Sequence, residues 1–218
     1  EREPGKDVLT VEGLTKAVDG QRVLDNVSFT VNKGDKIALV GSNEVANTTL
    51  LKILAGELEV DAGEYKWGVT ISRAYFPKDN TYLFEGAHAN LVDWLREFSP
   101  VKTDNHVRSF LGRMLFSGED ALKPVRVLSG GEKVRLVMAR MMITNPNALL
   151  LDQPTNHLDL EAITALNNGL RDYSSVIVFT SHDHQLVQTI ANRIIEITPG
   201  GIKDMRCTYD EYLQKASY

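Results

Sequence analysis

The chain has 218 residues, and its 43% apolar and 24% charged content is typical of a globular protein, which excludes a disordered or low-complexity chain. Its 24 basic and 29 acidic residues give a net charge of −5, which excludes a general attraction to polyanions such as RNA or membrane surfaces. The single cysteine, Cys207, cannot form an internal disulfide, and the sequence contains no apolar run of membrane-spanning length and no signal peptide. We therefore expect a cytoplasmic protein.

The N-terminal part of the chain predicts a linker remnant followed by strands. Residues 1–6 are polar and are expected to be the remnant of an interdomain linker, and residues 7–218 are expected to form one domain. Apolar and β-branched residues predict strands at 8–11 and 27–31, with a turn at Asp19 and Gly20.

The next segment is nearly a phosphate-binding loop. An apolar strand at 37–40 precedes it and a helix containing Leu50 follows it, as the pattern of Gly, four residues, Gly-Lys and Ser or Thr requires. The chemical centre is altered, because alanine and asparagine replace the second glycine and the lysine, and an acidic residue lies inside the loop. The candidate phosphate-contacting residues are Gly41, Ser42, Asn43, Glu44, Val45, Ala46, Asn47, Thr48 and Thr49.

After this loop, short strands are expected at 65–67 and 69–76, followed by a helical insert at about 85–143. Within the insert, Ser129 and Glu132 have the spacing of a capping box, which satisfies two backbone N–H groups at a helix start. The intervening Gly130 and Gly131 are not needed for a capping box. They would leave a bare helix N-terminus that a phosphate group can approach.

The C-terminal part alternates strands with helices, which predicts a mainly parallel sheet covered by helices. Two continuous apolar runs predict strands buried on both faces, and the remaining elements complete the sheet and its cover. The expected strands are 148–152, 176–180, 194–197 and 202–205. Three helices are expected: one that starts near residue 159, one at 185–191 and one at 209–215.

Three stretches are expected at the carboxyl edge of this sheet: the loop after Val40, the carboxylate of Asp152 and the imidazole of His182. Taken singly, each also fits a structural role: a loop without lysine fits an ordinary strand-to-helix turn, Asp152 a cap, and His182 a strand-end residue. Their convergence at one edge favours a nucleotide site.

Two stretches resemble motifs of the ATP-binding cassette (ABC) ATPases. Leu128–Glu132 resembles the signature motif of that family, and Leu151–Asp159 is similar to its Walker B motif and D-loop. The resemblance implies an α/β fold of the P-loop NTPase type, with a mainly parallel sheet, an antiparallel β portion and a helical insert that contains the signature motif. It also implies ATP and Mg²⁺ as ligands.

Further stretches look most like the ABC-F subfamily, whose members are soluble, have two ATPase domains on one chain and act on ribosomes: Asn156–Asp159, Ser181–His184, Ile194–Ile197 and Tyr209–Leu213. By that resemblance the chain is the second of two tandem domains. Its expected partners are another ABC nucleotide-binding domain, in tandem or as a homodimer, and the ribosome or RNA through parts outside this chain.

The resemblance also implies a role for individual residues. Thr48 and Asp152 would hold Mg²⁺, the residue after Asp152 would polarise water, and His182 would contact the γ-phosphate. Gln153 stands in place of the catalytic glutamate, and an amide cannot accept the proton of water, so hydrolysis should be slow whether the change is natural or engineered. Lys78 stands in place of a glutamine beside the γ-phosphate, where it would restore part of the missing positive charge. Because of Asn47, Glu44 and Ala46, the domain's own site should still bind ATP weakly.

In ABC dimers the signature motif of one domain completes the ATP site of the other. The resemblance therefore implies that Ser129, Gly130, Gly131 and Glu132 contact a nucleotide held by a partner domain. Two alternatives stay open: the ATPase subunit of a membrane transporter, and a dimerisation module of this fold without nucleotide chemistry.

Overall fold

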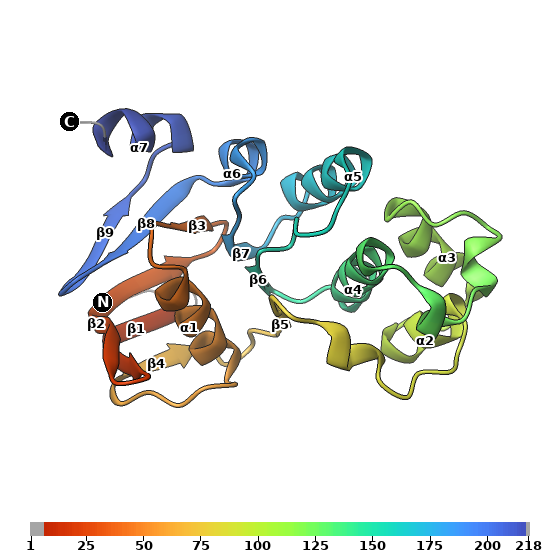
Figure 1. Ribbon diagram of the computed structural model, residues 1–218, viewed down its shortest axis with the longest axis horizontal. Helices are drawn as coiled ribbons and strands as arrows, with labels where there is room; N and C mark the ends of the chain where they lie inside the picture. The colour runs from red at the N-terminus through yellow and green to blue at the C-terminus, as the bar shows by residue number, and fades with distance from the viewer. Residues whose placement is uncertain (1–6, 217–218) are drawn as a thin grey trace. The chain divides into compact units, whose positions relative to one another are not determined.

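The computed structural model describes residues 7–216, which form two compact units (Figure 1). The first contains residues 7–75, 147–153 and 174–216, and the second contains 76–146 and 154–173. The predicted linker at 1–6 lies outside the described residues, and the domain boundaries remain a prediction. Within residues 7–216, none of the helices is both long enough and apolar enough to cross a membrane.

An antiparallel sheet of three strands forms one part of the first unit, in the order β2-β1-β4. Its strands are β1 (Asp7–Val18), β2 (Gln21–Asn32) and β4 (Ala62–Trp67). The β1–β2 hairpin turns at Asp19 and Gly20, whose φ angles of 50° and 78° suit the tight turn that matches strand twist. The turn predicted from these two residues is therefore confirmed.

The second sheet has six strands in the order β5-β6-β7-β3-β8-β9. Strands β6, β7, β3 and β8 run parallel, and β9 pairs with β8 antiparallel. The bounds are β3 (Lys36–Val40), β5 (Arg73–Phe76), β6 (Ala148–Asp152), β7 (Val176–Thr180), β8 (Arg193–Thr198) and β9 (Gly201–Met205). Every residue of β6 and β7 is buried, as their uninterrupted apolar runs predicted.

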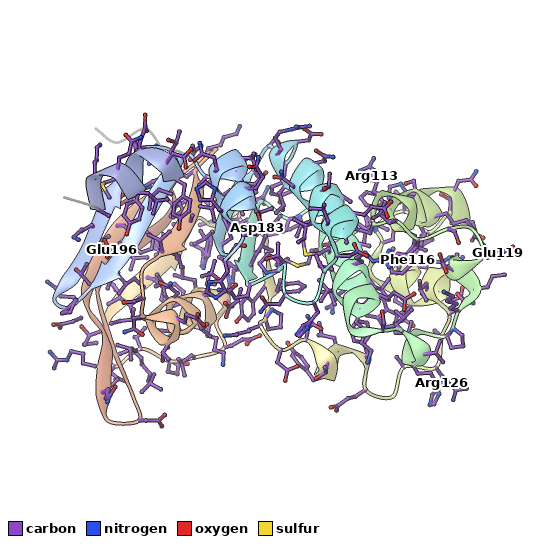
Figure 2. The ribbon with its side chains drawn as sticks, turned by 45° about the horizontal axis from the view of Figure 1, so that its top comes forward. Arg113, Phe116, Glu119, Arg126, Asp183 and Glu196 are labelled. Carbon is purple, nitrogen blue, oxygen red and sulfur yellow. The ribbon has the colours of Figure 1, made fainter. Side chains whose placement is uncertain are left out.

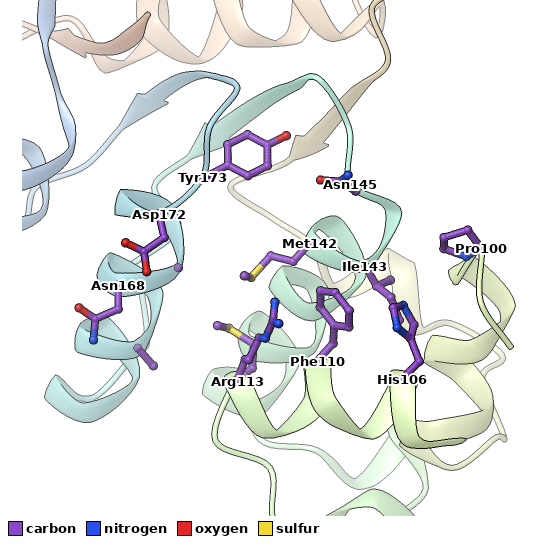
Figure 3. Close-up of a pocket in the computed structure, with 13 residues that line it drawn as sticks. Pro100, His106, Phe110, Arg113, Met142, Ile143, Asn145, Asn168, Asp172 and Tyr173 are labelled. Carbon is purple, nitrogen blue, oxygen red and sulfur yellow. The ribbon is translucent and has the colours of Figure 1, made fainter. Parts of the chain in front are cut away.

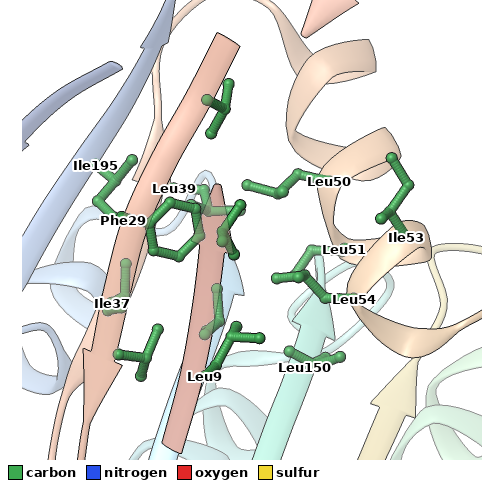
Figure 4. Packing of buried hydrophobic residues seen from close by; sticks show 14 of the residues in the cluster. Leu9, Phe29, Ile37, Leu39, Leu50, Leu51, Ile53, Leu54, Leu150 and Ile195 are labelled. Carbon is green, nitrogen blue, oxygen red and sulfur yellow. The ribbon is translucent and has the colours of Figure 1, made fainter. Parts of the chain in front are cut away.

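Helix α1 (Glu44–Ala55) follows β3 and contacts β2, β6 and β7. Leu50, Leu51, Ile53 and Leu54 are fully buried against the core that Figure 4 shows. Burial of such side chains stabilises the fold by about 1.5–3 kcal/mol each. The helix is therefore held firmly against the sheet. Two further helices complete the first unit: α6 (His184–Ile190) and α7 (Tyr209–Ala216).

The second unit is helical. Helices α2, α3 and α4 pack on one another through fully buried residues such as Leu95, Val107 and Leu136. Its elements are η1 (Thr81–Phe84), α2 (Leu91–Phe98), α3 (Asp104–Arg113), η2 (Asp120–Leu122), η3 (Val125–Val127), α4 (Gly130–Thr144) and α5 (Leu160–Arg171). Figure 2 labels Arg113 and Phe116 near the end of α3, where Phe116 is buried and Arg113 is exposed.

Two local predictions are wrong. The strand expected from residue 69 begins only at Arg73, and Val69 is 99% exposed in a turn. The N–H of Ile71 donates to the carbonyl of Gly68 at 3.0 Å, and this bond closes a turn where the β-branched residues predicted a strand. Helical periodicity predicts that Leu115 shares an apolar helix face with Val107, Phe110 and Leu111, but α3 ends at Arg113. Leu115 lies beyond it with a φ of 63° and 38% exposure.

Candidate functional site

The loop between β3 and α1 is organised by its own side chains. Gly41 has a φ of 108°, a conformation that favours glycine, and a Cβ atom there would lie 3.3 Å from Cγ of Glu196. Asn43 caps α1, and its Oδ1 accepts a hydrogen bond of 3.1 Å from the backbone N–H of Ala46. One N–H group that a phosphate-binding loop would offer to a ligand is therefore already bonded internally.

The acidic residue of this loop contacts the predicted phosphate-sensing histidine. Oε1 of Glu44 lies 3.0 Å from Nε2 of His182, and the two side chains are 46% and 65% exposed. Glu44 is also in the first turn of α1, where the positive end of the helix dipole favours a negative group. A carboxylate of the protein therefore occupies the surroundings in which a phosphate would be expected.

The residue that replaces the phosphate-binding lysine points inward. Asn47 is 5% exposed, and its Oδ1 has no hydrogen-bond partner among the described residues. Thr48, next to it, is half-buried, and Thr49 is buried in α1. The other candidates in this loop, Ser42 and Val45, are exposed.

At the carboxyl ends of β6 and β7, Asp152 and Gln153 share one hydroxyl group. Oγ1 of Thr180 donates to Oδ1 of Asp152 at 3.0 Å and accepts from the backbone N–H of Gln153 at 3.0 Å. All three residues are buried. Neither Oδ2 of Asp152 nor Oε1 of Gln153 has a hydrogen-bond partner within the part of the chain that the structure describes.

These residues fit a Mg²⁺ ion. A buried carboxylate oxygen without a donor is costly, and a cation removes that cost. Within residues 7–216 no three His, Cys, Asp or Glu side chains are grouped as metal ligands. A site with a single carboxylate matches Mg²⁺, which is usually held by one or two protein oxygens together with water and phosphate. Asp152 and the Thr48 hydroxyl are the residues that would hold it.

The N-terminus of α4 has the predicted capping box. Oγ of Ser129 accepts from the N–H of Glu132 at 3.3 Å, and the Glu132 carboxylate accepts from the N–H of Ser129 at 2.8 Å. The second of these bonds lowers the pKa of the Glu132 carboxyl, with a smaller contribution from Lys123. The capping interpretation of this motif is confirmed, and its nucleotide role remains a prediction.

The two glycines of this motif differ in their surroundings. A Cβ atom on Gly131 would lie 2.8 Å from the backbone oxygen of His157, so this glycine is required by the close approach of the segment before α5. A Cβ on Gly130 would meet nothing within 4 Å. Gly130 is therefore the residue that leaves the start of α4 open to a ligand.

The structure brings together Glu44 with His182 and Asp152 with Gln153, each pair within the first unit. Lys78 is exposed in the loop after β5, within the second unit. The sequence interpretation missed Thr180. Its one indication was a hydroxyl residue at the end of an otherwise apolar strand, beside the strand that ends in Asp152.

A groove of about 890 Å³ lies within the second unit, between α3, the end of α4 and α5. Figure 3 shows Asn168 of α5 and the C-cap residue Asp172 on one wall, with Phe110 and Arg113 of α3 on the other. Met142 lies at the floor. The guanidinium of Arg113 stacks over the Phe110 ring at 4.7 Å, so a cation lies at an otherwise mainly apolar wall.

Sequence comparisons match the chain to known proteins along most of its length. The family model described as "ABC transporter" matches residues 24–156. The "Uncharacterized ABC transporter ATP-binding protein YkpA" of Bacillus subtilis (strain 168) is 63% identical over 217 residues, which are 99% of this chain and 40% of that protein. "ABC transporter F family member 2" of Arabidopsis thaliana is 28% identical over 211 residues, 97% of this chain and 31% of that protein. The chain spans less than half of either relative.

Among solved structures, the crystal structure of a nucleotide-free ATP-binding cassette from an ABC transporter is similar to this chain. Its TM-score is 0.77 at 18% sequence identity, and the match covers 97% of this chain and 96% of that one. At this identity the likeness shows the fold alone. The predicted α/β P-loop architecture, with parallel and antiparallel strands flanked by helices, is confirmed.

Proposed function

Because the chain belongs to the ABC transporter family, we propose that it is a nucleotide-binding domain of the ABC-F type, the second of two on a longer chain. The stretches from Asn156 to Asp159 and from Ser181 to His184 support this subfamily. A relative that spans almost the whole chain is named as an F family member. ABC domains work in pairs, so the expected partner is a second domain of this kind.

The domain's own site is proposed to bind ATP and Mg²⁺ weakly and to hydrolyse ATP slowly. The internal bond from Asn43, the carboxylate of Glu44 and the neutral Asn47 each reduce the attraction of the loop for phosphate. Gln153 cannot act as a general base, which removes a contribution of roughly 10²–10⁴-fold to hydrolysis.

The main function is proposed to lie at the start of α4, which would complete an ATP site on the partner domain. The observation on which this rests is the open face at Gly130, beside a capping box that holds the first turn in place. Backbone N–H groups and the positive end of the helix dipole would meet the phosphates there. Ser129 and Glu132 would fix the geometry of that turn.

The test is ATP turnover by a two-domain protein that joins this chain to an ABC domain with an intact phosphate-binding loop. Ser129→Arg places a long side chain at the start of α4 and should lower turnover at the partner's site at least about 10-fold, because it blocks the approach of the nucleotide. Ser109→Arg, the same change at an exposed position on α3, is the control. Equal turnover in the two variants would refute the proposed role.

The biological setting is proposed to be translation in the cytoplasm, through a ribosomal contact. Co-sedimentation of the two-domain protein with ribosomes in the presence of ATP is the measurement. Binding to ribosomes, but not to membrane vesicles, is the expected result. Binding to neither ribosomes nor vesicles would favour the alternative of a dimerisation module of this fold without nucleotide chemistry.

One observation favours a second candidate function, the ATPase subunit of a membrane transporter. Such a subunit needs a surface groove for a helix of its membrane partner, and the groove beside Phe110 and Arg113 has a suitable apolar lining. Co-purification with a membrane protein, lost on Phe110→Asp, would support this candidate over the ribosomal one.

A further inference from the structure

We propose that Thr180 is a positioning residue for the cation site, a role that nothing in the family motifs assigns to it. It determines which oxygen of Asp152 faces the cation and holds the backbone of Gln153. The inference rests on the proposed function, because it takes Asp152 as the residue that holds Mg²⁺. Asp152 and Thr180 are neighbours in the register of the parallel strands β6 and β7, so their side chains leave the same edge of the sheet.

The direction of both hydrogen bonds is fixed by chemistry. A threonine hydroxyl has one proton and two lone pairs, an ionised carboxylate only accepts, and a backbone N–H only donates. Oγ1 of Thr180 must therefore give its proton to Oδ1 of Asp152 and accept the N–H of Gln153, both at 3.0 Å. With Thr180 only 3% exposed, water does not compete freely for either bond.

This arrangement divides the two oxygens of Asp152 between two tasks. Oδ1 is bonded to Thr180, whereas Oδ2 is buried and without a hydrogen-bond partner among residues 7–216. The carboxylate cannot rotate without breaking the bond to Thr180. Oδ2 is thus the oxygen that remains for a divalent cation.

The same hydroxyl also acts on the residue that follows. Gln153 has a φ of 53°, a left-handed conformation that residues other than glycine seldom adopt unless their surroundings impose it. Its N–H is bonded to Thr180, and its side chain is 6% exposed with Oε1 unpartnered in the described chain. Thr180 therefore holds two successive residues of the site, one through its side chain and one through its backbone.

A purely structural role would give a different outcome from a positioning role. If Thr180 only satisfied a buried carboxylate, its loss would lower stability and leave the affinity for a cation unchanged. If Thr180 positions Asp152, its loss should lower the affinity of the site for a cation. Removal of a residue that orients a metal ligand typically lowers metal affinity about 10–100-fold.

The experiment uses the whole chain with Asn47→Lys, Glu44→Gly and Ala46→Gly, which should restore nucleotide binding. Mn²⁺ is titrated by electron paramagnetic resonance in the presence of saturating ADP, and ADP affinity is measured separately in EDTA. Thr180→Val should lower the affinity for Mn²⁺ at least about 10-fold. The affinity for ADP in EDTA should stay within about 2-fold of that of the chain with Thr180. Thr180→Ser, which keeps the hydroxyl, should restore Mn²⁺ affinity.

Two further variants keep the test decisive. Thr189→Val makes the same change at an exposed position on α6 and should alter neither affinity. If Thr180→Val does not fold, Thr180→Cys takes its place. The thiol is only a weak hydrogen-bond donor, so this variant should also have a lower affinity for Mn²⁺.

Two results would overturn the inference, and they are distinguishable. ADP binding with unchanged Mn²⁺ affinity in the Thr180 variants overturns the positioning role alone. Failure of the restored loop to bind ADP at all overturns the proposed nucleotide site, and the role of Thr180 with it.

Discussion

The N-termini of α1 and α4 are the same kind of structure with opposite chemistry. Both helices have a side-chain cap at the N-terminus, Asn43 for α1 and Ser129 for α4, and both have an acidic residue in the first turn. At α1 the carboxylate of Glu44 extends to His182, and Asn43 bonds the N–H of Ala46. At α4 the carboxylate of Glu132 folds back onto the N–H of Ser129 and leaves the face at Gly130 open.

The position of the acid within the turn explains this difference. At the third helical residue a glutamate can reach the N–H of the cap, so its charge is used inside the turn. At the first helical residue that bond is out of reach, and the carboxylate extends across the end of the helix. The start of α1 is therefore partly occupied by the protein's own carboxylate, whereas the start of α4 is not.

The largest expected effect comes from substitutions that free the N-terminus of α1 for phosphate binding. Asn47→Lys combined with Glu44→Gly and Ala46→Gly should raise ATP affinity at least about 100-fold. A bond to a charged group contributes about 1.5–3 kcal/mol, and a carboxylate some 4 Å from a phosphate costs roughly 1–4 kcal/mol. Isothermal titration calorimetry with ATP and Mg²⁺ measures the change.

The matched control for this conversion is Asn47→Met with the same two glycine substitutions. It has a side chain of similar length to lysine and no charge, so the difference between the two variants isolates the positive charge at residue 47. The control should gain less than a tenth of the affinity gained with lysine. Unchanged affinity in both variants would mean that the loop is not a phosphate site.

A second comparison separates the two glycines of α4. Gly131→Ala should lower the free energy of unfolding by about 1–3 kcal/mol, because its Cβ would lie 2.8 Å from the His157 oxygen. Gly130→Ala should be neutral or stabilise by up to roughly 1 kcal/mol, since alanine favours the helix and meets no neighbour. Urea denaturation measures both. Equal effects would show that the segment at His157 moves away without cost.

The smallest expected effect is the pH dependence of the capping box. The folded pKa of Glu132 lies below its ordinary value of 4.5, so its charge stabilises the fold above pH 4.5 and that contribution is lost as the pH falls through the folded pKa. Glu132→Gln keeps the hydrogen bond and removes the charge. It should cost about 0.3–1 kcal/mol at pH 7, and this cost should shrink as the pH falls through the folded pKa of Glu132.

The control for the pH experiment is Glu119→Gln, because the Glu119 side chain forms no capping hydrogen bond. The difference in unfolding free energy between this variant and the parent chain should not follow the same pH profile. A Glu132→Gln difference that stays constant from pH 7 to pH 2 would contradict the assigned role of the charge.

Much of the fold and part of the site follow from local sequence patterns. The continuous apolar runs of β6 and β7, the hairpin turn at Asp19 and Gly20, and the capping box from Ser129 to Glu132 were each predicted and are each present. These features depend on residues within one element or one turn. Their geometry is therefore decided by backbone preferences and short-range hydrogen bonds.

The bonds that connect distant parts of the chain were not predicted. Arg193 binds Asp35 at 2.7 Å across 158 residues, and the guanidinium also binds Asp204. Both Arg193 and Asp35 are almost completely buried, so removal of either one would leave the other without this partner in the core. No local pattern identifies such partners.

The sequence by itself determined the order of elements, the buried strands and the identity of the altered loop, because each is set by residues close together in the chain. Only the tertiary structure showed that Glu44 contacts His182, that Thr180 holds Asp152 and Gln153, and that Gly130 is open whereas Gly131 is closed in by His157. Each of these depends on strands and loops brought together by packing of the core. The chemistry of the site thus depends on contacts between residues that are far apart in the sequence.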